Sequence, residues 1–222
     1  MTTFHDHLII NRWLLGLFNQ ESLKAFKNRL GDDRLTGIGE SGQTRFFEEL
    51  DTALFHSDFV LPTDLRRYDL NVSRHWQAIT ESRNRKEGHE LEMKYFQYLS
   101  LLFTEIYLDW FFNKKEELAA ALNRTLQGYL KEEQARRLSA YEAADLNKIA
   151  YWNATGSGKT LLMHINILQY RDYCQGKTDK VIVLTPNEGL SRQHVQELAD
   201  SGFHAALFDK NSGGLFADEI IV

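Results

Sequence analysis

The chain has 222 residues, of which 43% are hydrophobic and 12% aromatic, and its formal net charge is −5. The apolar content excludes a disordered chain, because it suffices to build a core. The acidic balance excludes a global positive field that would attract nucleic acid. The single cysteine, Cys174, excludes an internal disulfide and a cysteine-cluster metal site.

Residues 1–6 carry neither the basic start nor the apolar core of a secretion signal. The most apolar run, residues 99–112, is interrupted by Glu105 and Asp109 and is too short to cross a bilayer. With one cysteine in the whole chain, these features predict a cytoplasmic protein without a membrane segment. The spacing of the histidines fits no zinc site, so we expect no metal held by protein side chains alone.

Residues 1–145 are expected to form a mainly α-helical amino-terminal domain. Apolar side chains recur there every three or four residues, which is the spacing of a buried helix face. A glycine-rich stretch over 31–43 predicts a loop, and Thr44 is expected to cap the next helix. The apolar faces are formed by Leu8, Ile9, Trp13 and Leu17; by Leu23, Phe26 and Leu30; by Phe46, Phe47 and Leu50; and by Leu65, Tyr68, Val72, Trp76 and Ile79.

The longest helix is expected over residues 90–112, followed by one or two shorter helices over 113–131 that Gly128 interrupts. Aromatic residues in the long helix could stack on nucleic-acid bases, but their helical spacing favours a place in the core. These are Tyr95, Phe96, Tyr98, Phe103, Tyr107 and Trp110.

Basic clusters at 66–67, 74–75 and 83–86 allow two interpretations. They could form a face that binds nucleic-acid phosphates, because lysine and arginine clusters displace counterions. Acidic residues such as Asp64 and Glu87 lie between them, which favours a solvated helix face.

The strongest signal is the sequence Y-W-N-A-T-G-S-G-K-T at 151–160, which predicts the end of a short apolar strand over 149–152, then a glycine loop, then the start of a helix. Gly156 and Gly158 can adopt backbone angles that turn successive N–H groups toward an anion. Lys159 would reach the β- and γ-phosphates of a nucleoside triphosphate, and the Thr160 hydroxyl would ligate Mg²⁺. The usual phosphate-loop pattern has a glycine where this chain has Asn153.

Strands and helices are expected to alternate after this loop. A helix over 160–173 ends near Gly176, and residues 181–184 are a continuous apolar run typical of a strand buried on both faces of a parallel sheet. A helix over 190–201 and strands at 205–208 and 220–222 complete the pattern. This order predicts an α/β domain of the doubly wound type over residues 146–222.

The sequences N-A-T-G-S-G-K-T at 153–160 and L-T-P-N-E-G-L-S-R-Q-H at 184–194 resemble motifs I and Ia of superfamily-2 helicases and translocases of the DEAD/DEAH type. They look most like the ATPase (R/Res) subunits of type I and type III restriction enzymes and related phage-defence helicases. Those subunits often read M-A-T-G-x-G-K-T, so that Asn153 stands where they have methionine. The resemblance covers residues 146–222 and implies an incomplete RecA-like phosphate-loop domain.

This resemblance implies ATP and Mg²⁺ as cofactors and assigns roles to individual residues. The loop Ala154, Thr155, Gly156, Ser157, Gly158, Lys159 and Thr160 would bind the nucleotide, with Lys159 and Thr160 catalytic and Thr160 on the Mg²⁺. Thr185, Pro186 and Asn187 would contact a nucleic-acid backbone, helped by Gln193. The alternative for these three residues is a loop with a helix cap. Gln134 is a candidate reader of adenine.

Hydrolysis of ATP needs an acidic pair at the end of an apolar strand, beside the Mg²⁺. Asp218 and Glu219 come before the apolar run 220–222, so a strand in that direction carries them to the wrong edge of the sheet. We therefore expect motif II and the second motor domain to lie outside these residues. The fragment alone is expected to bind ATP weakly, to hydrolyse little and to unwind nothing.

The leading interpretation is the ATP-binding part of an ATP-dependent DNA helicase or translocase, a hydrolase of restriction-modification or antiviral defence. DNA is the expected partner, with RNA not excluded, together with other subunits of a defence complex. The alternative is a helical module over 1–145 that docks partner proteins, with the nucleotide site as a regulatory switch. A phosphate-loop kinase is a third reading, which the segment 185–193 disfavours.

Overall fold

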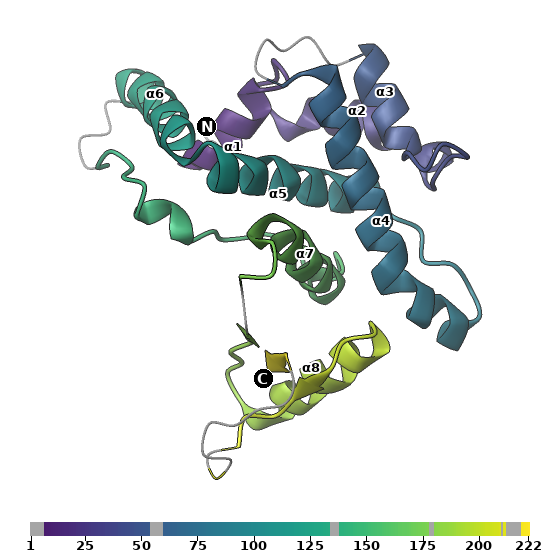
Figure 1. Cartoon of the computed structure of the whole chain (residues 1–222). Helices are drawn as coiled ribbons and strands as arrows, with labels where there is room; N and C mark the ends of the chain where they lie inside the picture. The colour runs from purple at the N-terminus through teal and green to yellow at the C-terminus, as the bar shows by residue number, and fades with distance from the viewer. Residues whose placement is uncertain (1–6, 54–59, 134–137, 178–179, 210, 212–218) are drawn as a thin grey trace.

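The computed structural model describes residues 7–53, 60–133, 138–177, 180–209, 211 and 219–222. Six α-helices form its amino-terminal part, and Figure 1 shows α5 running through the middle of them. They are α1 (Ile9–Gly16), α2 (Leu23–Leu30), α3 (Arg45–Ala53), α4 (Pro62–Glu87), α5 (Tyr95–Asn113) and α6 (Lys115–Glu133). Short 3₁₀ turns lie at Asp33–Leu35 and Asp145–Asn147.

Local residues set the ends of α3 and α4, and the predicted cap at Thr44 is one of them. The Thr44 hydroxyl accepts a hydrogen bond from the Phe47 N–H at 3.1 Å, so Thr44 caps α3 as expected. Pro62 lies in the first turn of α4, where its missing N–H costs nothing. Gly88 ends α4 with a φ of 73°, the left-handed conformation that glycine adopts without strain.

Two predictions about the helices are wrong. The helix expected over 90–112 begins at Tyr95, because Gln97 accepts a hydrogen bond from the Lys94 N–H at 2.9 Å and completes a capping box there. The longest described helix is instead α4, with 26 residues. Gly128 does not interrupt α6, because a single exposed glycine costs only about 1 kcal/mol within a long helix.

The aromatic residues of α5 belong mainly to the core, as predicted. Tyr98, Tyr107 and Trp110 are buried, whereas Phe96 is 41% exposed. Tyr98 stacks on Phe46 of α3 with ring centroids 5.0 Å apart. Base stacking is therefore closed to the buried rings, because protein covers their faces.

Several basic residues of α4 form ion pairs and hydrogen bonds within the protein. Arg74 pairs with Asp172, and Lys86 Nζ lies 2.8 Å from the Asp200 carboxylate. The guanidinium of Arg83 donates to the Glu197 carbonyl at 2.9 Å and to the hydroxyl of Ser201 at 2.8 Å. The basic residues were expected to form a solvated helix face. Several of them instead join α4 to residues 172–201 of the chain.

The carboxyl-terminal part contains two helices and a small parallel sheet. Its elements are α7 (Lys159–Cys174), β1 (Val181–Ile182), α8 (Glu188–Asp200), β2 (Ala205–Ala206) and β3 (Ile220–Ile221). The strand order is β1-β3-β2, with Val181 and Ala205 both in register with Ile220. The predicted alternation of strands and helices around a parallel sheet is confirmed for these elements.

Two predicted strand features are wrong. Residues 149–152 form no strand, and their Tyr151 and Trp152 side chains are 42% and 76% exposed. The run 181–184 is not buried on both faces, because Ile182 and Leu184 are 67% and 91% exposed. Val181 and Val183 face an apolar cluster under α7 and α8, and β1 is an edge strand whose other face no described helix covers.

Helix α7 lies between the helical part and the sheet (Figure 1). Its Leu162 and Ile165 belong to the large core built mainly by α1 to α6. Its Ile167 belongs to a second cluster with Leu198 of α8 and Ile220 of β3. Helix α7 therefore contributes to both cores, and the domain boundary between residues 145 and 146 stays a prediction. In the part of the chain that is described, no helix has the length and apolarity to cross a membrane.

A buried histidine lies where α7 meets α8. His164 is fully buried, and its Nδ1 is 2.8 Å from the Ser201 hydroxyl. Burial and the nearby charges of Arg83 and His194 lower the pKa of His164 from 6.5 to about 4. The folded state thus binds fewer protons than the unfolded state between these pH values, so His164 costs stability as the pH falls from 6.5 to 4.

We predict that His164→Asn reduces the acid lability of the protein. Asparagine can keep a hydrogen bond to Ser201 but does not titrate. Between pH 6.5 and 4, the variant should lose about 3 kcal/mol less unfolding free energy than the wild type. Urea unfolding at the two pH values measures the difference. Parallel losses in both proteins would show that His164 does not titrate in this way.

Candidate functional site

The loop at 154–160 has the geometry that the sequence predicts for an anion site. Gly156 and Gly158 adopt φ values of +78° and +81°, and the Ser157 N–H donates to the Ala154 carbonyl at 3.2 Å to close the turn. Gly158 is the N-cap of α7, whose first turn begins at Lys159. The loop therefore leads directly to the N–H groups at the amino end of a helix, which bind anions.

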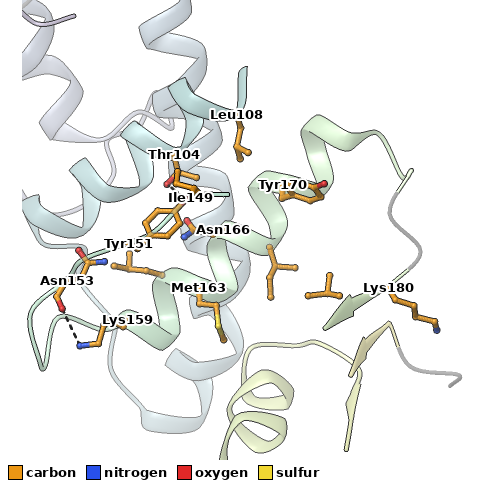
Figure 2. A pocket seen from close by; sticks show the side chains of 13 residues that line it. Thr104, Leu108, Ile149, Tyr151, Asn153, Lys159, Met163, Asn166, Tyr170 and Lys180 are labelled. Carbon is orange, nitrogen blue, oxygen red and sulfur yellow. Dashed lines mark hydrogen bonds between the residues drawn. The ribbon is translucent and has the colours of Figure 1, made fainter. Parts of the chain in front are cut away.

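Lys159 lies exposed over this loop. Its Nζ donates to the carbonyl of Ala154 at 2.9 Å and to that of Asn153 at 3.4 Å, as Figure 2 shows for Asn153. These are neutral acceptors on the loop itself, and a phosphate oxygen would form a stronger, charge-assisted bond. The ammonium group is thus held close to the place where an anion would bind. Thr160 follows in the first turn of α7 and is partly exposed.

The residues present fit a phosphate chain with its Mg²⁺. A Cβ built on Gly156 meets no atom within 4 Å, so the space beside this residue is open. The loop supplies backbone N–H donors, Lys159 supplies a positive charge, and Thr160 supplies a hydroxyl for the metal. In the described residues, no group of three or more histidine, cysteine or acidic side chains could hold a metal by itself.

One residue that contacts the loop escaped the sequence analysis. The Gln97 amide in the first turn of α5 donates from Nε2 to the Ser157 carbonyl at 3.1 Å. A Cβ built on Gly158 would lie 2.9 Å from the same nitrogen. Gln97 lies 60 residues before Ser157, and no local motif connects the two. Its place three residues after the N-cap of α5 was the one signal available, and that indicated capping only.

A cavity of about 510 Å³ opens beside α7 (Figure 2). Asn153 and Lys159 lie at one end of it and Lys180 at the other, with Thr104, Met163 and Tyr170 among the lining residues between them. The segment expected to be a strand before the loop supplies Ile149 and Tyr151 to its wall. This segment therefore packs against α5, where the Tyr151 hydroxyl lies 3.0 Å from that of Thr104.

Hydrogen bonds to the buried carboxyl group of Glu105 hold α7 in place. Gln169 and Tyr173 of α7 each donate a hydrogen bond to the Glu105 carboxyl of α5 at 2.9 Å, and Asn71 of α4 donates another at 3.2 Å. Burial raises the pKa of Glu105 to about 7, although these three donors favour the charged form. The network ties the helix that carries Lys159 to both α4 and α5.

The residues expected to contact nucleic acid lie between β1 and α8. Asn187 is the N-cap of α8, and its Oδ1 accepts from the Leu190 N–H at 3.0 Å. The Thr185 hydroxyl lies 2.6 Å from that of Ser191, and Pro186 is exposed. The Gln193 amide donates to Glu197 at 2.7 Å, and no described hydrogen bond joins it to Thr185, Pro186 or Asn187.

Two further residues from the sequence analysis, Gln134 and Asp218, lie outside the described residues. Glu219 precedes β3, which runs parallel to β1, and its carboxylate pairs with Arg171 at 2.9 Å. It therefore lies at the amino end of a strand, as expected, and not at the edge where a parallel sheet binds its ligands.

A known protein family matches the part of the chain that contains the loop 154–160. Residues 131–213 match the family model described as DEAD/DEAH box helicase. The resemblance drawn from motifs I and Ia is thereby confirmed at the level of that family, whose members are ATP-hydrolysing enzymes that bind nucleic acid and typically use ATP with Mg²⁺. The match gives no support to a restriction-enzyme subunit specifically. No curated protein and no solved structure matches the chain.

We predict that Gly156→Ala and Gly158→Ala each destabilise the protein by about 1 kcal/mol or more, because an alanine is strained at positive φ. The matched control is Gly128→Ala within α6, where a Cβ meets nothing and alanine should stabilise the helix by about 1 kcal/mol. Urea unfolding of the three variants measures the effects. A gain of stability at position 156 or 158 would contradict the loop geometry.

Proposed function

We propose that this chain contains the ATP·Mg²⁺-binding site of an ATP-dependent helicase or translocase that acts on DNA. The observation that carries the proposal is the loop 154–160. Gly156 and Gly158 adopt left-handed backbone conformations, and the loop leads into the amino end of α7. Lys159 is exposed beside the loop. The family match over residues 131–213 includes this loop and supports the helicase class.

In this proposal, each part of the loop has a role in binding the triphosphate. The unpaired N–H groups of the loop and of the first turn of α7 would hold the phosphates, and the Lys159 ammonium would supply a positive charge to them. The Thr160 hydroxyl would be a ligand of the Mg²⁺ that accompanies ATP, and this metal would supply neutralisation of negative charge during phosphoryl transfer. Lys159 would exchange the carbonyls of Asn153 and Ala154 for phosphate oxygens, because a charged acceptor binds an ammonium more strongly.

The polymer is proposed to bind at the turn between β1 and α8. Thr185 and Pro186 follow the carboxyl end of β1, which is the edge where an open parallel sheet binds ligands. The Asn187 Nδ2 group can donate to a phosphate oxygen while its Oδ1 caps α8. A place in restriction or phage defence, with partner subunits, rests on the similarity of motifs I and Ia to those ATPase subunits.

Binding without efficient hydrolysis is the expected behaviour of residues 1–222. The described strands β1, β2 and β3 are followed by no pair of acidic residues in the described part of the chain. In-line transfer needs carboxylates beside the Mg²⁺ that orient the metal and the attacking water, and the described residues supply no acidic pair there. Nucleotide binding is therefore the property by which this chain can be tested directly.

We predict that Lys159→Ala weakens binding of ATP·Mg²⁺ about tenfold or more, because charge-assisted bonds to the phosphates are lost. Isothermal titration calorimetry measures the affinity. Lys177→Ala, which removes an exposed lysine beyond the other end of α7, is the control and should bind like the wild type. Equal ATP affinity in the wild type and Lys159→Ala would contradict the proposed site.

We predict that Asn187→Asp weakens binding of a single-stranded DNA oligonucleotide about fivefold, because a donor to phosphate is replaced by a negative charge. Aspartate caps helices as well as asparagine, so α8 should remain intact. The control is Gln127→Glu on the exposed side of α6, which changes the net charge equally. Fluorescence anisotropy measures the affinities, and equal weakening by both variants would point to charge alone and contradict a contact at Asn187.

A further inference from the structure

The helical part contributes a direct hydrogen bond to the phosphate loop. Gln97 of α5 is partly buried, and both ends of its amide are engaged. Its Oε1 accepts from the Lys94 N–H at 2.9 Å, which fixes the side chain against the start of α5. Its Nε2 then donates to the Ser157 carbonyl at 3.1 Å. The amide thus connects the first turn of α5 to the centre of the loop.

This bond fixes the direction of a loop N–H group. A trans peptide group is planar, so the carbonyl of one residue and the N–H of the next point in opposite directions. All described peptide bonds are trans. Because the Ser157 carbonyl points to Gln97, the Gly158 N–H points away from α5. Within the described part of the chain, this N–H has no hydrogen-bond acceptor.

The peptide between Ser157 and Gly158 needs such a constraint. Glycine adopts several backbone conformations at similar cost, so a loop with Gly156 and Gly158 can turn its peptide planes away from an anion. Gly158 also has no side chain in the space that Gln97 occupies, since a Cβ there would be 2.9 Å from Nε2. The glycine and the glutamine therefore fit each other.

We propose that Gln97 is a positioning residue of the nucleotide site, which holds the Ser157–Gly158 peptide with its N–H directed at the phosphates. This inference rests on the proposed function, because it assigns the same loop to a triphosphate. It extends the site to α5 of the helical part, 60 residues before the loop. Gln97 does not touch the nucleotide and acts through the loop backbone.

Two substitutions separate this role from capping of α5. Gln97→Glu keeps the acceptor for the Lys94 N–H, and glutamate suits this position of a capping box, but it cannot donate to Ser157. Gln97→Met removes both bonds without adding charge. Matched controls are Gln127→Glu and Gln127→Met on the exposed side of α6. Inorganic triphosphate with Mg²⁺ is the probe, because it reports on the loop without the base or ribose.

We predict that both Gln97 variants of the full chain bind inorganic triphosphate about fivefold more weakly than the wild type, as expected for one lost hydrogen bond. Both Gln127 controls should bind normally. Calorimetry gives the affinities, and urea unfolding gives the stability of each variant. A lower stability of Gln97→Met than of Gln97→Glu reports the cap, whereas the shared loss of affinity reports the loop.

Wild-type affinity in either Gln97 variant would overturn the positioning role. This outcome is distinguishable from failure of the proposed function, because Lys159→Ala is measured with the same probe. If Lys159→Ala loses affinity and the Gln97 variants do not, the loop binds phosphate without help from α5. If Lys159→Ala binds as tightly as the wild type, the triphosphate site and this inference both fail.

Discussion

The position of α7 is the constraint on which the site depends. Leu162 and Ile165 are buried in the helical core, and Ile167 is buried against α8 and the sheet. Buried polar contacts from Gln169 and Tyr173 to Glu105 add directional bonds to this packing. Because the helix is fixed on two sides, its amino end has one place in the molecule. The loop before Lys159 is therefore fixed beside the unpaired N–H groups at the amino end of α7.

The helical part is therefore more than an attachment to a nucleotide-binding unit. Helix α4 holds α8 through Arg83 and Lys86, and α5 contacts both the loop and α7. A partner that moved α4 or α5 would disturb contacts that end at the phosphate loop and at the carboxyl end of α8. This arrangement gives the alternative interpretation, a docking module with a nucleotide switch, a physical route between its two parts. The proposed motor function and such regulation are compatible.

Local signals in the sequence predicted much of the structure. The cap at Thr44 and the helix after T-G-S-G-K-T, which ends near Gly176, depend on neighbouring residues, and both are present. Features set by distant partners were not predictable. The apolar stretch 149–152 has the composition of a strand, but it packs beside α5 and joins no sheet. Leu184 is apolar and was expected to be buried, but it lies beyond the end of an edge strand and is exposed. Gln97 meets Ser157 only because α5 and α7 pack together.

The most direct test of the central claim observes the loop N–H groups themselves. Nuclear magnetic resonance of the chain labelled with ¹⁵N-glycine resolves Gly156 and Gly158 from other glycines, such as Gly128 in α6. On titration with ATP·Mg²⁺, the account predicts that the amide signals of Gly156 and Gly158 shift strongly while that of Gly128 stays in place. Unchanged signals from Gly156 and Gly158 at saturating nucleotide would contradict it.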